Sequence, residues 1–220
     1  MSNRIALTSL CLLVSLTIFA QNGSKWRIGF KAGWNYSDQL MSGSPEGNDK
    51  TFNRSTDWLS GVHAGFRSEL LLKESIALNA DLLYNQRGIK TIIRYPSGGT
   101  SSFSTNSHYL SLPLTAGFKL IDQLWFEAGG EISAWLGQTA LLDGEKINSF
   151  DDSGYAATDV GLIGGLSYQF GTWIKLSGRY YRGLGNVQDI TFTNANGQPI
   201  EDKAKLNFHG VQVSLTVFPF

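Results

Sequence analysis

The stretch that decides the fold is Trp26-Arg27-Ile28-Gly29-Phe30-Lys31-Ala32-Gly33-Trp34-Asn35. Its even-numbered positions are all apolar, and its odd-numbered positions are all polar or glycine. Successive side chains of a β-strand point to opposite faces, so this pattern predicts a strand with one apolar and one polar face.

The same alternation recurs seven times along the rest of the chain. The further stretches lie at residues 62–70, 76–87, 109–119, 124–136, 159–170, 174–181 and 211–217. Eight strands of this kind predict an all-β, antiparallel up-and-down barrel. The apolar face of such a barrel can point in either direction. It points inward in a soluble lipocalin-like barrel and outward in an outer-membrane barrel.

The lengths of the connections favour the membrane barrel. Four connections are long, at about 36–57, 88–106, 138–155 and 185–204, and they alternate with short ones at 71–74, 121–123 and 171–172. Outer-membrane barrels have long extracellular loops and short periplasmic turns. We therefore expect an eight-stranded transmembrane β-barrel in the outer membrane, with a soluble lipocalin-like ligand-binding barrel as the alternative.

Aromatic residues of the apolar faces sort toward two levels. The predicted short-turn level holds Trp26, Phe118, Phe126 and Phe170, and the predicted long-loop level holds Trp34, Trp58, Tyr84 and Tyr180. Amphipathic rings settle at both interfaces of a membrane, so two such levels support the membrane barrel. By the same alternation, Trp125, Trp135 and Trp173 fall on the polar faces.

The chain begins with a predicted signal peptide over residues 1–20. Arg4 is followed by an apolar run from Ile5 to Phe19, which ends at Ala20. This run is short for a membrane anchor and ends in a small residue, as a cleaved export signal does. We expect residues 21–220 to form the mature barrel.

Charge and cysteine content exclude several functions. Cys11 is the single cysteine and would leave with the signal peptide, so the mature protein has no disulfide and no thiolate metal site. Loss of Arg4 leaves 17 Lys and Arg against 18 Asp and Glu, a net charge of −1. That balance and the export signal both argue against binding to nucleic acid.

The polar faces carry the candidate site. An eight-stranded barrel is just wide enough for its own side chains to fill it. The predicted interior charge network consists of Arg27, Lys31, Arg67, Glu69, Asp81, Arg87, Lys119, Glu127, Glu131, Asp159, Lys175 and Arg179. Buried charges must be paired, so these residues predict a polar plug, with a narrow pore or transport channel as the alternative.

The three histidines and one proline are further candidates, for metal binding or catalysis and for a strand irregularity. His63, His108 and His209 lack the spacing of a metal site, and we expect no metal, cofactor or catalysis. His108 with Ser107 or Ser111 is the pair to test for a lipid-modifying enzyme. Pro113 removes a ladder donor inside a predicted strand and therefore predicts a bulge or local kink.

Three short motifs resemble those of the PorT-type outer-membrane β-barrel family. They are Asp81-Leu-Leu-Tyr-Asn-Gln-Arg-Gly88, Tyr109-Leu-Ser-Leu-Pro-Leu114 and Arg179-Tyr-Tyr-Arg-Gly-Leu-Gly-Asn186. The resemblance implies an integral outer-membrane location and an eight-stranded barrel, and it implies no reaction. Ser111 replaces an acidic residue of that family's pattern.

The sequence thus predicts a non-enzymatic protein of the outer membrane of a Gram-negative cell envelope. We expect a plugged barrel that presents surface loops for envelope structure, binding or assembly. Its expected partners are outer-membrane lipid, the outer-membrane assembly machinery, which reads terminal residues such as Phe220, and a protein partner at the extracellular loops.

Overall fold

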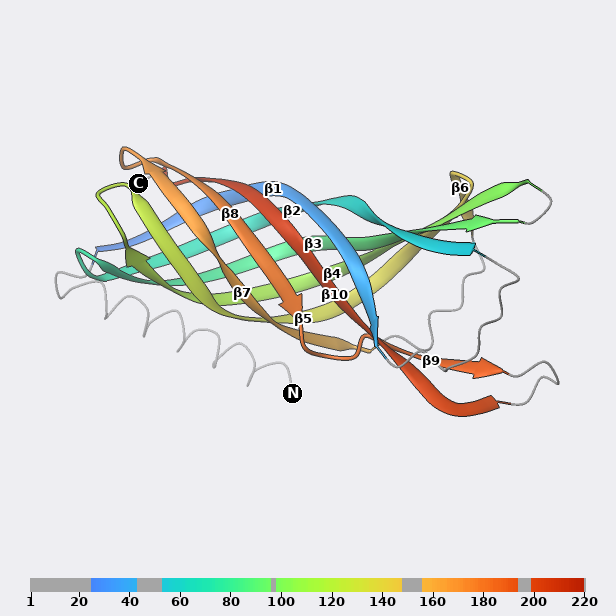
Figure 1. Ribbon diagram of the computed structural model, residues 1–220. Coiled ribbons are helices and arrows are strands. Elements are labelled where there is room, and N and C mark those ends of the chain that lie inside the picture. The colour runs from blue at the N-terminus through green and yellow to red at the C-terminus, as the bar shows by residue number, and fades with distance from the viewer. Residues whose placement is uncertain (1–24, 43–52, 96–97, 148–155, 194–198, 220) are drawn as a thin grey trace, which may run out of the picture.

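The computed structural model describes residues 25–42, 53–95, 98–147, 156–193 and 199–219 (Figure 1). The predicted signal peptide and Phe220 lie outside the described residues. The described strands are β1 (Lys25–Ser42), β2 (Asn53–Lys73), β3 (Ile76–Arg94), β4 (Thr100–Lys119), β5 (Leu124–Leu142), β6 (Glu145–Ile147), β7 (Thr158–Phe170), β8 (Ile174–Gly183), β9 (Gln188–Thr193) and β10 (Pro199–Val217).

Eight of these strands form a closed antiparallel ring, as predicted. Their order is β1-β2-β3-β4-β5-β7-β8-β10, and β10 pairs back onto β1. The closing ladder runs from Phe30 opposite Val217 to Ser42 opposite Lys205. The two remaining strands are short additions, because β6 pairs with β5 and β9 pairs with β10.

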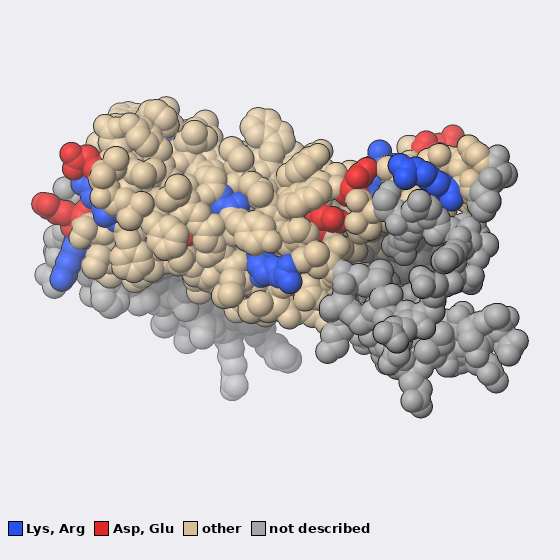
Figure 2. Space-filling view, viewed as in Figure 1, with Lys and Arg blue, Asp and Glu red and all other residues tan. Residues whose placement is uncertain are grey.

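The apolar faces of the ring point outward, which confirms the membrane-type burial and rules out the lipocalin-like alternative. Trp34, Phe30 and Leu162 are 70%, 60% and 55% exposed, whereas Arg67, Glu69 and Asn85 on the alternate positions are fully buried. Figure 2 shows a mostly uncharged wall, with the charged side chains gathered mainly toward the two ends of the molecule. The described residues contain no helix that is long and apolar enough to cross a membrane.

The strands run further than the alternation predicted. β2 and β4 have 21 and 20 residues, whereas 9–11 residues suffice for a membrane-spanning strand. Much of the predicted long connections is therefore strand, and β3 and β4 remain paired as far as Arg94 opposite Thr100. The bounds predicted for the long connections are therefore too wide, because polar residues beyond the apolar belt still pair as strands.

The extended strands separate into two groups on the long-connection side (Figure 1). The pairing of β1 with β2 ends at Ser37 opposite Leu59. Beyond that point β1 stays paired with β10 up to Ser42, and β2 stays paired with β3 down to Asn53. The barrel wall thus divides into projecting hairpin sheets.

The structure has no β-bulge at Pro113, so the prediction of a bulge there is wrong. Ala80 pairs with Leu114 and Leu83 pairs with Ser111, so the register of β3 and β4 is the same on both sides of the proline. The missing N–H interrupts the ladder there without shifting it. The register shift of this region lies instead between β4 and β5, at His108 and Tyr109.

One glycine is required by the packing of the wall. A Cβ on Gly33 of β1 would lie 2.0 Å from the carbonyl oxygen of Val213 and 2.8 Å from the ring of His63. Real Cβ atoms do not approach backbone oxygens so closely. Gly33 therefore leaves the space that the buried imidazole occupies.

Candidate functional site: the polar barrel interior

The interior of the barrel carries most of the predicted charged residues. At the centre lies a group that we call the charge cluster. It consists of Lys31 from β1, Arg67 and Glu69 from β2, Asp81 from β3, Glu127 from β5, and Lys175 and Arg179 from β8. All seven side chains are at most 2% exposed. The alternation of each strand points them inward, and the closure of the ring brings them together.

Ion pairs in the charge cluster join strands from opposite sides of the ring. Glu127 accepts hydrogen bonds from Arg67 at 2.7 Å and from Arg179 at 2.5 Å. Asp81 accepts from Arg179 at 2.8 Å and from Lys31 at 2.6 Å. Each of these carboxylates therefore pairs with two cations, and such pairing offsets the cost of burying the charges.

Toward the short turns, the charge cluster continues to Arg27. Glu69 accepts a hydrogen bond from Lys175 and from Arg27, whose Nε lies 2.9 Å from the carboxylate. Arg27 also donates to the side chain of Gln169 at 2.7 Å, and its guanidinium stacks on Phe218 with 4.1 Å to the ring centroid.

On the long-connection side of the charge cluster, histidine, asparagine and serine side chains form a hydrogen-bonded chain around the inner wall. The ring of His63 lies 2.7 Å from both Ser214 Oγ and Asn35 Oδ1. Asn35 donates to Asn85 at 2.5 Å, and Asn85 donates to Ser111 at 3.2 Å. Ser111 thus continues the polar chain where the PorT-type pattern has an acidic residue.

A second ionic group surrounds Arg87 nearer the long connections. Arg87 is paired with Glu131 and lies 3.3 Å from Asp159, which also accepts a 2.6 Å hydrogen bond from Tyr181. The guanidinium lies 3.8 Å from the centroid of the Tyr181 ring. Cation–π contact and ion pairing together hold Arg87 across the lumen.

Buried apolar side chains pack beside Arg87, whose guanidinium lies 5.4 Å from the ring centroid of Tyr109. This apolar cap consists of Tyr109, Ile163, Tyr181, Val187, Leu206 and Phe208. The sequence does not predict the cap, because Val187 and Leu206 lie in or next to a predicted loop. The alternation of β4 and β8 does place Tyr109 and Tyr181 on the polar, inward faces, and this is the signal that the sequence offers.

Lys119 is the one predicted network residue that does not reach the interior ion pairs. Its side chain is 29% exposed at the last position of β4, and its ammonium lies 3.6 Å from the exposed Asp122 in the following turn. The alternation gives its side of the strand correctly, but the barrel ends at this level. Lys119 therefore lies at the short-turn mouth.

The serine–histidine pairs considered for catalysis are not assembled. Ser107 and Ser111 are fully buried inside the barrel. His108 alternates to the outer wall, where its ring lies 2.7 Å from the hydroxyl of Tyr84 and 3.2 Å from that of Thr139. Among the described residues, no group of three His, Cys, Asp or Glu side chains is arranged to hold a metal ion.

A closed ring of alternating strands, with an apolar outer wall and a charged interior, defines an outer-membrane type of β-barrel. The chain belongs to the family of outer membrane protein beta-barrel domains, whose model matches residues 19–189. The protein therefore resides in the outer membrane, and its short turns face the periplasm by the rule that such barrels follow.

Solved structures of outer-membrane proteins are similar in fold. Neisserial surface protein A is 13% identical, with 89% of this chain and 99% of that chain covered and a TM-score of 0.42. The attachment invasion locus protein Ail of Yersinia pestis is 7% identical, with 88% and 99% covered and a TM-score of 0.41. The outer membrane protease OmpT of Escherichia coli is 8% identical, with 89% and 95% covered and a TM-score of 0.45. Among curated proteins, no sequence matches this chain.

Proposed function

We propose that the protein is a non-conducting, non-enzymatic barrel whose plugged interior supports projecting hairpins for envelope structure, binding or assembly. The observation that carries the proposal is the burial of the charge cluster. A lumen wide enough for water would expose part of its lining, but Arg67 and Glu69 are 0% exposed and Lys175 is 1% exposed.

The closure has two layers of different chemistry. The charge cluster fills the middle of the lumen with paired groups, and the apolar cap packs Tyr109, Phe208 and their neighbours beside the second ionic group at Arg87. An ion would have to break buried pairs and then cross an apolar constriction without hydration. Both steps oppose conduction.

Planar-bilayer recording tests the closed lumen. We expect the purified protein to give no ohmic conductance steps. The variant Arg67→Ala with Arg179→Ala, Tyr109→Ala and Phe208→Ala removes cations of the charge cluster as well as residues of the apolar cap, and its steps would show that the assay detects an opened barrel of this size. Steps from the unchanged protein, equal to those of the variant, would overturn the proposal.

The projecting hairpins are the surface that we propose serves envelope structure, binding or assembly. β2 pairs with β3 as far as Asn53, and β5 pairs with β6 at Leu141 opposite Lys146, both well beyond the apolar belt. Since the predicted mature chain has no cysteine, a single introduced thiol reports its own location. We expect Lys146→Cys to react with a membrane-impermeant maleimide on intact cells, and Asp122→Cys to react only after the outer membrane is permeabilised. The reverse pattern would refute the orientation.

Export and membrane insertion complete the proposal. We infer cleavage after Ala20, delivery of residues 21–220 to the assembly machinery, and a place among PorT-type barrels, on the sequence motifs given above. The mass of the protein purified from outer membranes tests the first step. A mature chain that begins at Gln21 is expected, and retention of residues 1–20 would contradict it.

A further inference from the structure

A cavity of about 520 Å³ lies at the short-turn mouth of the barrel. Its lining comes from the ends of β1, β2, β4, β5 and β7 and from the adjoining turns, namely Arg27, Leu71, Leu72, Lys73, Glu74, Lys119, Asp122, Trp125 and Gln169. Sites for small ligands measure about 300–1,000 Å³ and combine apolar walls with a few polar groups. The size of this cavity falls in that range, but six of its nine lining residues are charged or polar, so its lining suits a charged ligand.

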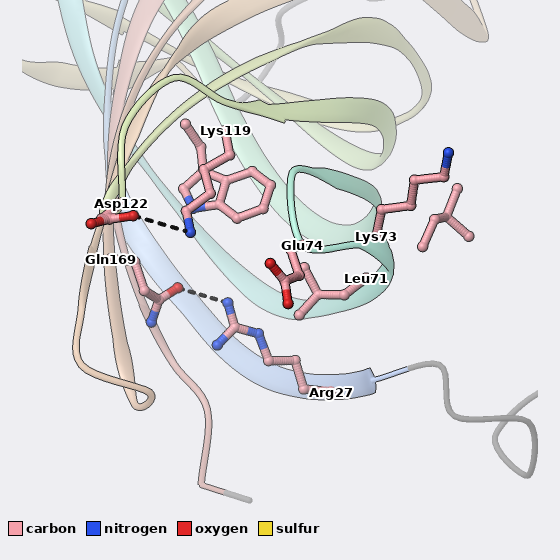
Figure 3. A pocket seen from close by; sticks show the side chains of 9 residues that line it. Arg27, Leu71, Lys73, Glu74, Lys119, Asp122 and Gln169 are labelled. Atoms are coloured by element: carbon pink, nitrogen blue, oxygen red, sulfur yellow. Dashed lines mark hydrogen bonds and ion pairs between the residues drawn. The ribbon is translucent and has the colours of Figure 1, made fainter.

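Charged groups of both signs face the cavity. Figure 3 shows the ammonium of Lys119 and the guanidinium of Arg27 on one side, and the carboxylate of Glu74 between them and Lys73. Among the residues that the structure describes, the ion-pair partner of Lys119 is the exposed Asp122, at 3.6 Å. A solvent-exposed ion pair of that kind contributes little, so Lys119 is available to a ligand.

The cavity is built on a rigid floor. Arg27 is fixed by Glu69, Gln169 and the carbonyl of Thr172, the last at 3.1 Å. Trp125 is 7% exposed, and on its ring lies the ammonium of Lys175, 5.4 Å from the centroid. A ligand that enters the mouth would therefore meet groups already held in place, which lowers the entropy lost on binding.

Buried charge beneath the cavity favours an anionic group at its floor. The charge cluster together with Arg27 contains five cations and three carboxylates. The cations are Arg27, Lys31, Arg67, Lys175 and Arg179, and the carboxylates are Glu69, Asp81 and Glu127. The group around Arg87, farther from the mouth, has one cation and two carboxylates. This asymmetry makes the short-turn half of the interior electropositive, and a charged cleft with low-dielectric walls concentrates ligands of the opposite sign.

We propose that the short-turn mouth binds a short periplasmic peptide that carries both a carboxylate and an amino group. The carboxylate would lie against Lys119 and Arg27, and the amino group would lie against Glu74. The mixed signs at the rim disfavour a pure polyanion. Inward-facing Arg27 and Trp125 place the cavity on the barrel axis, so it receives molecules from the periplasm and not lipid headgroups from outside the wall.

Fluorescence anisotropy with the full mature chain in detergent micelles tests the site. The probe is Ala-Glu-Lys-Ala with an amidated C-terminus and an uncharged dye on its N-terminus, so that the Glu carboxylate and the Lys amino group are its only charges. It is compared with Ala-Gln-Lys-Ala and Ala-Glu-norleucine-Ala prepared in the same way. We expect the unchanged protein to prefer the first peptide over both others. Lys119→Gln should weaken its binding about fivefold and reduce the preference for Glu over Gln, because Arg27 remains, while Glu74→Gln should abolish the preference for Lys over norleucine.

The matched controls lie at the opposite end of the molecule. Glu145 and Lys146 of β6 are exposed and carry the same two charges, so Glu145→Gln and Lys146→Gln should leave the affinity unchanged. Retention of heat-modifiable migration on a gel shows that each variant is folded. Equal losses in the control variants would mean binding by net charge and would overturn the proposal.

Two competitors separate the proposed occupant from other anions. Inorganic phosphate at the concentration of the peptide should not displace the probe, and displacement would reveal a site for small anions instead. Vesicles of phosphatidylglycerol should bind the unchanged protein and Lys119→Gln equally. A loss of vesicle binding in Lys119→Gln, with peptide binding unaffected, would assign the mouth to lipid and overturn the proposal.

Discussion

Replacement of Glu127 by glutamine should be among the most damaging single changes in the barrel. Glu127 accepts from Arg67 at 2.7 Å, from Arg179 at 2.5 Å and from Ser167 at 2.8 Å, and it is 1% exposed. At an effective dielectric constant near 20, each of the two ion pairs represents about 6 kcal/mol of attraction. Desolvation of the charges offsets much of this sum.

The amide of the variant would leave two buried guanidinium groups with fewer carboxylates than they need. Breaking a buried pair by removal of one partner costs about 3–5 kcal/mol, and we expect a loss of that size in the free energy of unfolding. The measurement is a urea titration in phospholipid vesicles, followed by tryptophan fluorescence.

A matched control removes the same charge at the surface. The Asp122 side chain is fully exposed, and its pair with Lys119 is long at 3.6 Å. Asp122→Asn should therefore leave the unfolding midpoint within the error of the titration. If Glu127→Gln cost less than about 1 kcal/mol, the reasoning that the charge cluster is buried and mutually compensated would be refuted.

Three further substitutions test other parts of the structure in the same titration. Tyr181→Phe removes the hydroxyl that donates to Asp159 and should cost about 1–3 kcal/mol, whereas an unchanged midpoint would contradict that hydrogen bond. Gly33→Ala places a Cβ against the carbonyl of Val213 and should cost about 1–3 kcal/mol by overpacking; a stabilised variant would show that the wall yields there. Leu215→Arg introduces a charge on the apolar outer wall, where Leu215 is 47% exposed, and should cost up to about 2–4 kcal/mol, and a smaller loss in vesicles than in micelles would argue against lipid contact at Leu215.

Which side chains of a strand share one face of the barrel wall was predictable, because it depends only on the local alternation of apolar and polar residues. Phe30 and Leu162 point outward and Arg67 and Asp159 point inward, as their positions in the sequence indicate. The same rule gives the correct side for Lys119, but it carries no information about where the barrel ends. The depth of a residue along the axis depends on the pairing of distant strands.

The ends of the strands could not be read in the same way. Residues 100–107 of β4 are Thr-Ser-Ser-Phe-Ser-Thr-Asn-Ser, which resembles a polar loop, yet they pair with β3 and β5. Beyond the apolar belt, the inner face of this strand carries polar residues such as Thr105 and Ser107 and its outer face is no longer apolar, so the apolar signal disappears while the ladder continues. The apolar cap was hidden for a related reason, because Leu206 becomes an inward residue only when β10 is extended past the predicted strand.

The ion pairs that cross the lumen have a consequence for how the protein is made. Glu69 on β2 pairs with Lys175, 106 residues later in the chain, and Asp81 pairs with Arg179, 98 residues later. A half-finished sheet that met lipid would therefore hold carboxylates whose partners had not yet arrived, and hydrocarbon penalises such groups heavily. Insertion and ring closure should then occur as one concerted event, in which the late strand β8 neutralises carboxylates of the early strands β2 and β3. A barrel of this kind is therefore expected to be either closed in the membrane or not inserted, with few stable, partly inserted forms.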